Sequence, residues 1–138
     1  MQDFVHLHVH TQYSLLDGQA SVARLVDKAM KNGMKGIAVT DHGNMFGIKE
    51  FTNYVNKKNS GPKGEIKDLK KRIAGIEAGT VECEDKEAEV AACKAKIVEA
   101  ENKLFKPIIG CEMYVARRTM DLKEGKPDQS GYHLIVLA

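Results

Sequence analysis

The chain has 138 residues, of which 43% are hydrophobic, and this suits one domain with a hydrophobic core rather than a disordered tail. Its 21 basic and 19 acidic side chains leave a formal net charge of +2, which by itself indicates neither a nucleic-acid nor a membrane surface. Three cysteines without a Cys-x-x-Cys pair fit reduced thiols better than disulfides or a zinc ribbon. Neither an export signal nor a long apolar run is found, so we expect a cytoplasmic protein without membrane association.

Histidines alternate with apolar residues near the start of the chain, in Phe-Val-His-Leu-His-Val-His-Thr at 4–11. Alternate side chains of a β-strand point to one face, so His6, His8 and His10 are expected to share a face. Neutral imidazole is a favoured ligand of zinc, iron and related ions. The pattern therefore indicates a metal site. The alternative is an amphipathic strand whose histidines meet solvent.

After the histidine strand, the sequence predicts a loop, a helix and a second strand. Asp17 follows the histidines in a loop that ends with Asp-Gly, a turn signal, and is a further candidate ligand. Apolar residues at helical spacing run from Ser21, a favourable N-cap, to Gly33, where a helix would end. Residues 36–40 then predict a short buried strand. Brief connections between these elements favour a βαβ unit in a mainly parallel sheet.

His42 directly follows that second strand. In parallel α/β folds, ligands gather at the carboxyl ends of the strands, which favours a functional role. Residues 41–44 would otherwise be an ordinary turn capped by an Asp or Asn side chain. A second helix is expected from residue 45 to about residue 56, and residues 57–64 are expected to form a linker or loop.

Residues 65–104 carry apolar side chains at helical spacing within a strongly charged sequence. They predict two helices separated near residues 79–85, and we expect an inserted antiparallel hairpin over residues 57–105. We favour a solvated insertion that packs mainly on itself, because charges of mixed sign usually mark an exposed helix. The functional alternative is an arm that binds a partner or touches DNA.

Two further strands are predicted after the hairpin. Residues 106–115 form an apolar pattern with one acid, Glu112, whose burial is costly unless the carboxylate is paired or binds a metal. Pairing with a nearby arginine is the alternative. After a polar connection, residues 132–138 predict another buried strand, with His133 at its entry.

The candidate ligands mix imidazole with carboxylate and include no cysteine. Such a set suits zinc, manganese or iron in hydrolytic chemistry, because structural zinc sites rely more on thiolates. Phosphoester cleavage is the natural reaction class. In chain order, the candidate residues are His8, His10, Asp17, His42, Glu112 and His133.

Four blocks of the sequence resemble, in the same order, the PHP domains of bacterial DNA polymerase III alpha subunits. They are Phe-Val-His-Leu-His-Val-His-Thr-Gln-Tyr-Ser-Leu-Leu-Asp-Gly at 4–18, Val-Thr-Asp-His-Gly-Asn-Met-Phe-Gly at 39–47, Lys-Pro-Ile-Ile-Gly-Cys-Glu at 106–112 and His-Leu-Ile-Val-Leu-Ala at 133–138. The resemblance implies an α/β fold, part of a distorted PHP-type (β/α) barrel with mainly parallel strands. It also implies that the six candidate residues are catalytic and bind up to three divalent metal ions, whereas His6 supports the site or packs in the core.

A (β/α) barrel typically needs about 200 residues or more, so residues 1–138 are expected to be a partial PHP domain, truncated at its C-terminal side. By the resemblance, the parent protein is a DNA-directed DNA polymerase, a nucleotidyltransferase of DNA replication. This chain would lack the polymerase palm and be at most a metal-dependent phosphoesterase, inactive when truncated. The implied roles are 3′–5′ exonuclease proofreading, pyrophosphate hydrolysis or subunit scaffolding. DNA and other polymerase subunits are the implied partners, and exposed sheet edges favour self-association.

Two alternatives to the polymerase interpretation stay open. The chain could be a free-standing PHP-family phosphatase of the histidinol-phosphatase type, or a catalytically inert structural module. The Ser-Leu-Leu-Asp-Gly and Pro-Ile-Ile-Gly-Cys-Glu blocks resemble the polymerase branch more than the phosphatases, and the intact ligand residues argue against an inert module.

Overall fold

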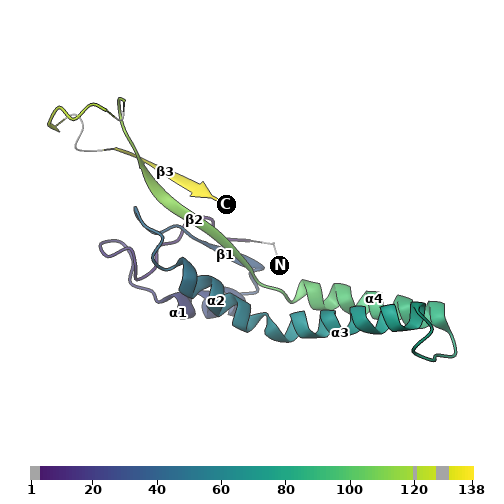
Figure 1. Ribbon diagram of the computed structural model, residues 1–138. Helices are drawn as coiled ribbons and strands as arrows, with labels where there is room; N and C mark the ends of the chain where they lie inside the picture. The colour runs from purple at the N-terminus through teal and green to yellow at the C-terminus, as the bar shows by residue number, and fades with distance from the viewer. Residues whose placement is uncertain (1–3, 120, 127–130) are drawn as a thin grey trace. The chain divides into compact units, whose positions relative to one another are not determined.

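The computed structural model describes residues 4–119, 121–126 and 131–138. Within these ranges the chain is a mixed α/β protein with four helices and a three-stranded sheet (Figure 1). It divides into two compact units: Met1–Val55 with Lys106–Ala138 forms the first, and Asn56–Phe105 forms the second. No helix in the described part of the chain combines the length and the apolar character that a membrane span requires.

The first helix, α1 (Val22–Lys31), has the ends that the sequence predicts. Ser21 is its N-cap and accepts a backbone N–H from the first turn. Gly33 follows the helix with φ 77°, a left-handed conformation that glycine adopts without steric cost. The helix contacts β1 (Gly36–Val39), all of whose residues are buried. The buried side chains of α1 are Val22, Val26 and Ala29.

The sheet has the strand order β1–β2–β3, with β2 (Lys106–Val115) in the middle (Figure 1). β1 and β2 are parallel, as expected, but β3 (Tyr132–Leu137) runs antiparallel to β2. The prediction of mainly parallel strands is therefore wrong for this pair, and the prediction that this last strand is buried is also wrong, because most residues of β3 are exposed. A parallel return needs a crossover connection, usually a helix, and the described residues between β2 and β3 form no α-helix.

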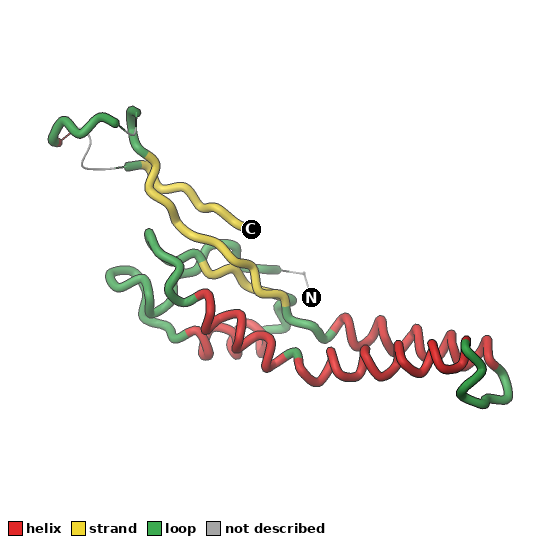
Figure 2. The backbone as a smooth tube through the Cα atoms, viewed as in Figure 1, coloured by secondary structure: helices red, strands yellow, loops and turns green. Residues whose placement is uncertain are grey.

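The N-terminal histidine segment runs beside β1 without forming a regular strand, and it is drawn as a loop in Figure 2. The N–H of Ala38 donates to the carbonyl of His6 at 2.8 Å, and the N–H of Thr40 donates to the carbonyl of Val9 at 2.9 Å. Between these two hydrogen bonds the chain advances two residues along β1 and three residues along the segment. The segment therefore contains one extra residue, as the longer strand of a β-bulge does. The predicted regular strand is wrong, because the extra residue interrupts the alternation between His6 and His8.

The linker predicted over residues 57–64 is also wrong. Only Asn59 separates α2 (Ile48–Lys58) from α3 (Ser60–Glu77), so these residues complete one helix and begin the next. Pro62 is tolerated because it lies in the first turn of α3, where a backbone N–H has no partner within the helix. The glycines on either side of it are solvent exposed and add no steric conflict.

The second unit contains α3 and α4 (Lys86–Asn102), which lie side by side as an antiparallel pair (Figure 2). An ion pair joins them across their surface, with Arg72 Nη2 2.7 Å from Glu89 Oε1. The side chain of Asp85 caps α4 by accepting the N–H of Ala88 at 3.0 Å. Two helices were expected in this region, and their description as an insertion within a longer domain stays a prediction.

Asn59 joins the two ends of this second unit. Its Nδ2 donates to the carbonyl of Phe105 at 2.8 Å, and its Oδ1 accepts the N–H of Phe105 at 2.9 Å. Asn59 is 5% exposed and Phe105 is 3% exposed. One side chain therefore satisfies both backbone polar groups of a buried residue, and those groups would be costly to leave unpaired.

Replacing Asn59 with alanine should lower the free energy of unfolding by about 2–4 kcal/mol, because the N–H and C=O of Phe105 would lose their partners. Urea denaturation followed by circular dichroism measures the change. The matched control is Asn53→Ala, at an exposed position of α2, with an expected change within about 0.5 kcal/mol. Similar losses for the two variants would contradict this role of Asn59.

Candidate metal centre

Strand pairing brings Glu112 to the carboxyl end of β1. His42, three residues beyond β1, pairs with Glu112 in the register of the β1–β2 ladder. The N–H of Gly43 donates to the carbonyl of Glu112 at 2.9 Å, and the N–H of Glu112 donates to the carbonyl of Asp41 at 3.2 Å. The backbone thus fixes the middle of β2 against the loop that carries His42.

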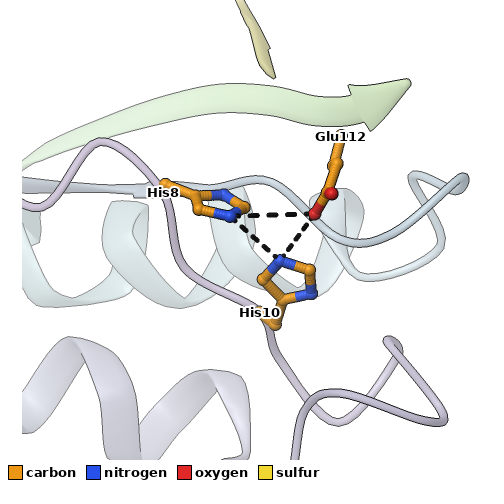
Figure 3. A group of neighbouring side chains, drawn as sticks. All are labelled: His8, His10 and Glu112. Atoms are coloured by element: carbon orange, nitrogen blue, oxygen red, sulfur yellow. Dashed lines mark hydrogen bonds and ion pairs between the residues drawn. The ribbon is translucent and has the colours of Figure 1, made fainter. Parts of the chain in front are cut away.

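Glu112 is 7% exposed, and its carboxylate is surrounded by three histidines. Its Oε2 lies 2.8 Å from His10 Nε2 and 3.7 Å from His8 Nε2, and its Oε1 lies 2.7 Å from His133 Nδ1. Figure 3 shows the Nε2 atoms of His8 and His10 facing each other and the carboxylate. The two nitrogens lie 3.4 Å apart. Imidazoles are therefore the partners of this buried acid. Of the two arginines that follow β2, Arg118 pairs with Glu124 and Arg117 lies over the ring of Tyr132.

His42 and Asp17 form a second contact at the same site. Asp17 Oδ2 lies 2.6 Å from His42 Nδ1 and 3.9 Å from His10 Nδ1. A carboxylate accepts the proton on Nδ1, and Nε2 of His42 then presents a lone pair. This Nε2 is buried and has no hydrogen-bond partner among the described residues. An imidazole with one nitrogen held by a carboxylate and the other left without a donor fits a metal ligand.

Potential ligand atoms lie within 4.8 Å of one another in three overlapping groups. The groups are His8 with His10 and Glu112, His10 with Asp17 and His42, and His42 with Glu112 and His133. Each group combines imidazole nitrogen with carboxylate oxygen and contains no thiol, a donor set that suits zinc, manganese or iron. The structure brings together all six side chains that the sequence marks as candidates, and these groups could hold a metal ion.

His6 lies outside the three groups. It is exposed, and its ring meets the ring of Phe4 edge to face with 4.8 Å between centroids. The expectation that His6 shares a face with His8 and His10 is wrong, because the extra residue in the segment changes the alternation after His6. Its exposure also excludes the expected packing in the core.

Two buried hydroxyl groups that the sequence reasoning missed hold the ligand rings in place. Thr40 Oγ1 lies 2.8 Å from His8 Nδ1, and Ser14 Oγ lies 2.9 Å from His10 Nδ1. Ser14 also accepts the N–H of His42 at 2.7 Å. With Nδ1 engaged in this way, the Nε2 atom of each ring points to the shared carboxylate. Ser14 lies four residues after His10, so the sequence held a signal for its contact, whereas Thr40 lies 32 residues from His8 and had none.

Asp41 was considered only as a turn cap, but it fastens the two ligand loops to each other. Its Oδ1 accepts the N–H of Thr11 at 2.6 Å, and its Oδ2 accepts the Thr11 hydroxyl at 2.8 Å. Asp41 is 1% exposed and Thr11 is fully buried. A weaker link lies at the surface, where Tyr13 donates its hydroxyl to Glu50 at 2.7 Å, and this hydrogen bond raises the pKa of Tyr13.

Asp41→Ala should lower the free energy of unfolding by about 3 kcal/mol or more, because two buried donors of Thr11 lose a charged acceptor. Asp41→Asn should cost less, since an amide oxygen still accepts one of the two hydrogen bonds. Urea denaturation of both variants measures the two losses in free energy of unfolding and shows which is larger. A loss for Asp41→Asn as large as that for Asp41→Ala would contradict this assignment of the two contacts.

Histidines and carboxylates gathered at the strand ends of an α/β fold are typical of metal-dependent hydrolases. Residues 6–98 match the PHP domain family, and the chain belongs to this family. It is 38% identical over 138 residues to DNA polymerase III subunit alpha of Borreliella burgdorferi and 37% identical over 136 residues to that of Treponema pallidum. Each comparison covers 98% of this chain and 8% of the relative. DNA polymerase III subunit alpha of Aquifex aeolicus is 54% identical over 50 residues, which is 36% of this chain and 4% of that relative.

Proposed function

We propose that this chain is a metal-binding part of a replicative DNA polymerase III alpha subunit and that its site hydrolyses phosphoesters. The single observation that carries the metal site is the buried Nε2 of His42, which has no partner in the described part of the chain. His42 belongs to two of the three ligand groups, and a metal ion held at its Nε2 would satisfy this atom. Membership of the PHP domain family and similarity to polymerase subunits support the biological setting.

In this proposal the sheet and its helices are part of a distorted PHP-type (β/α) barrel, and residues 57–105 are a helical hairpin inserted into it. The chain spans less than a tenth of the length of the two relatives that match nearly all of it. The polymerase activity, and the contacts with DNA and with other polymerase subunits, would therefore belong to the longer protein. A cytoplasmic location and self-association through sheet edges stay predictions.

The six proposed ligands have complementary tasks. Divalent ions held there, up to three, would polarise a phosphoryl oxygen and stabilise negative charge on the leaving oxygen. Asp17 and Glu112 supply the negative charge that retains cations beside the imidazoles. Thr40 and Ser14 hold the rings of His8 and His10 in one orientation, so little freedom is lost when a ligand is bound. The proposed ligands are His8, His10, Asp17, His42, Glu112 and His133.

Two kinds of bond fit this proposal: the phosphodiester at the 3′ end of a nucleic acid and the phosphoanhydride of pyrophosphate. Removal of 3′-terminal nucleotides and hydrolysis of pyrophosphate both break a bond between phosphorus and oxygen, and both need the same kind of charge stabilisation. Scaffolding of other polymerase subunits is the non-catalytic role within the same proposal. The chain by itself would be at most a phosphoesterase.

The first test is the metal content of the purified chain, measured by elemental analysis after incubation with zinc or manganese and removal of free ions. The chain should retain divalent metal, and the His8→Ala/His10→Ala double variant should lose most of it. His6→Ala is the matched control, because His6 is a histidine of the same segment outside the ligand groups, and it should keep the metal. Absence of metal from the unaltered chain, or equal metal in the double variant, would contradict the proposed site.

The same three proteins then test the reaction. A single-stranded oligonucleotide and pyrophosphate are offered in separate assays with the metal present. Hydrolysis of either one that survives in His6→Ala and disappears in the double variant would assign the activity to this site. If the chain retains metal but hydrolyses neither compound, the scaffolding role is favoured.

Thr40→Val should weaken metal affinity by about 10- to 100-fold, because His8 Nδ1 loses the hydroxyl that orients the ring. Competition with a metal-binding dye measures the affinity. Thr52→Val is the control: its hydroxyl bonds to carbonyls within α2, away from the ligands, and the affinity should be unchanged. Equal affinities for the two variants would show that the Thr40 hydroxyl does not orient the ligand.

A further inference from the structure

We propose that one face of α3 binds the phosphate backbone of duplex DNA. This face, called the lysine face below, consists of Lys63, Lys67, Lys70 and Lys71. The choice of DNA as the partner rests on the proposed function, whereas the charge distribution is a property of the helix itself. The interaction would be additional to the metal site, whose proposed ligands all belong to the first compact unit.

The four lysines lie on one side of the helix. They are spaced at i, i+4, i+7 and i+8, which confines them to an arc of about 100° at 3.6 residues per turn. Of the acidic residues of the same stretch, Glu65 lies on the opposite side, as does Arg72 with its ion pair to Glu89, and Asp68 lies three residues before Lys71, at the border of the lysine face. The apolar positions of α3 form a third stripe between these two sides. They are Ile66, Leu69, Ile73 and Ile76.

The positive charge of the lysine face is not compensated within the described part of the chain. All four lysines are exposed. Lys63 donates its Nζ to the neutral side chain of Asn56 at 2.9 Å, and no carboxylate forms an ion pair with Lys67, Lys70 or Lys71 among the described residues. A solvated helix that neutralises its own surface would intersperse acids along this face, and here Asp68 at its border is the one adjacent acid of the same stretch.

The dimensions and the residue type both favour DNA. From the first lysine to the last, the face extends about 12 Å, which covers three or four phosphates of one strand at about 3.4 Å per phosphate along the duplex axis. Lysine is a flexible point charge that positions a protein on the backbone without reading bases. An acidic protein would satisfy the same charge, but protein interfaces favour aromatic residues and arginine over lysine, and this face offers neither.

The test compares two triple variants of the whole chain with equal loss of charge. One removes most of the lysine face, as Lys67→Gln/Lys70→Gln/Lys71→Gln. The control removes three exposed lysines spread around and just beyond α4, as Lys94→Gln/Lys96→Gln/Lys103→Gln. Glutamine has nearly the helix propensity of lysine, so both should keep the helical signal in circular dichroism. Fluorescence anisotropy with a labelled DNA duplex, over a series of sodium chloride concentrations, measures the binding constant.

The lysine-face variant should bind the duplex at least about tenfold more weakly at low salt, and its plot of log K against log salt should be shallower by about 3 units. The control variant should stay within about one unit of the unaltered chain. Equal losses in the two variants would overturn the proposal, because net charge alone would then explain binding. Binding of polyglutamate but not of DNA by the unaltered chain would also overturn it, in favour of an acidic protein partner.

Metal content, measured on the same samples, separates this proposal from the proposed function. A lysine-face variant that retains metal but loses DNA binding supports the DNA-binding face independently of the catalytic site. A chain that binds the duplex through this face but holds no metal contradicts only the metal site. Unchanged DNA binding in a lysine-face variant that retains metal contradicts only the present proposal.

Discussion

The buried carboxylate of Glu112 requires polar partners, and the segments that supply these partners form the rest of the site. One side of β2 meets the loop after β1, which brings His42, and the other side pairs with β3, which brings His133. The N-terminal segment adds His8 and His10 across β1. A charge that would be costly to bury alone is therefore held where three separate stretches of chain converge.

The hydroxyls and carboxylates behind the imidazoles make this convergence specific. Thr40, Ser14 and Asp17 each approach an Nδ1 atom, so Nε2 is the nitrogen of each ring that would face a ligand. Asp41 holds the loops themselves through Thr11. The arrangement is ordered by contacts within the protein, which favours binding because less orientational freedom remains to be lost.

The sequence was sufficient to mark the six side chains that the structure brings together and to place most helices and strands, because side-chain spacing and residue chemistry are visible in it. It did not reveal the extra residue before His8, since that depends on which backbone groups pair with β1. Gly61, Pro62 and Gly64 suggested a linker, yet the start of a helix tolerates proline, and the exposed glycines add no clash. The antiparallel direction of β3 and the role of Thr40 arise from contacts between distant segments, which spacing alone does not encode.

The contact between Asn59 and Phe105 has a consequence for folding. These residues are 46 positions apart, and the two helices between them form from neighbouring stretches of chain, so this unit has mostly local contacts. Once it has formed, the effective connection between β1 and β2 shrinks from about 66 residues to about 20, and the entropy lost in pairing these parallel strands falls by about 1 kcal/mol. The long segment between the two strands would then assist formation of the sheet, because it folds early and holds its own ends together.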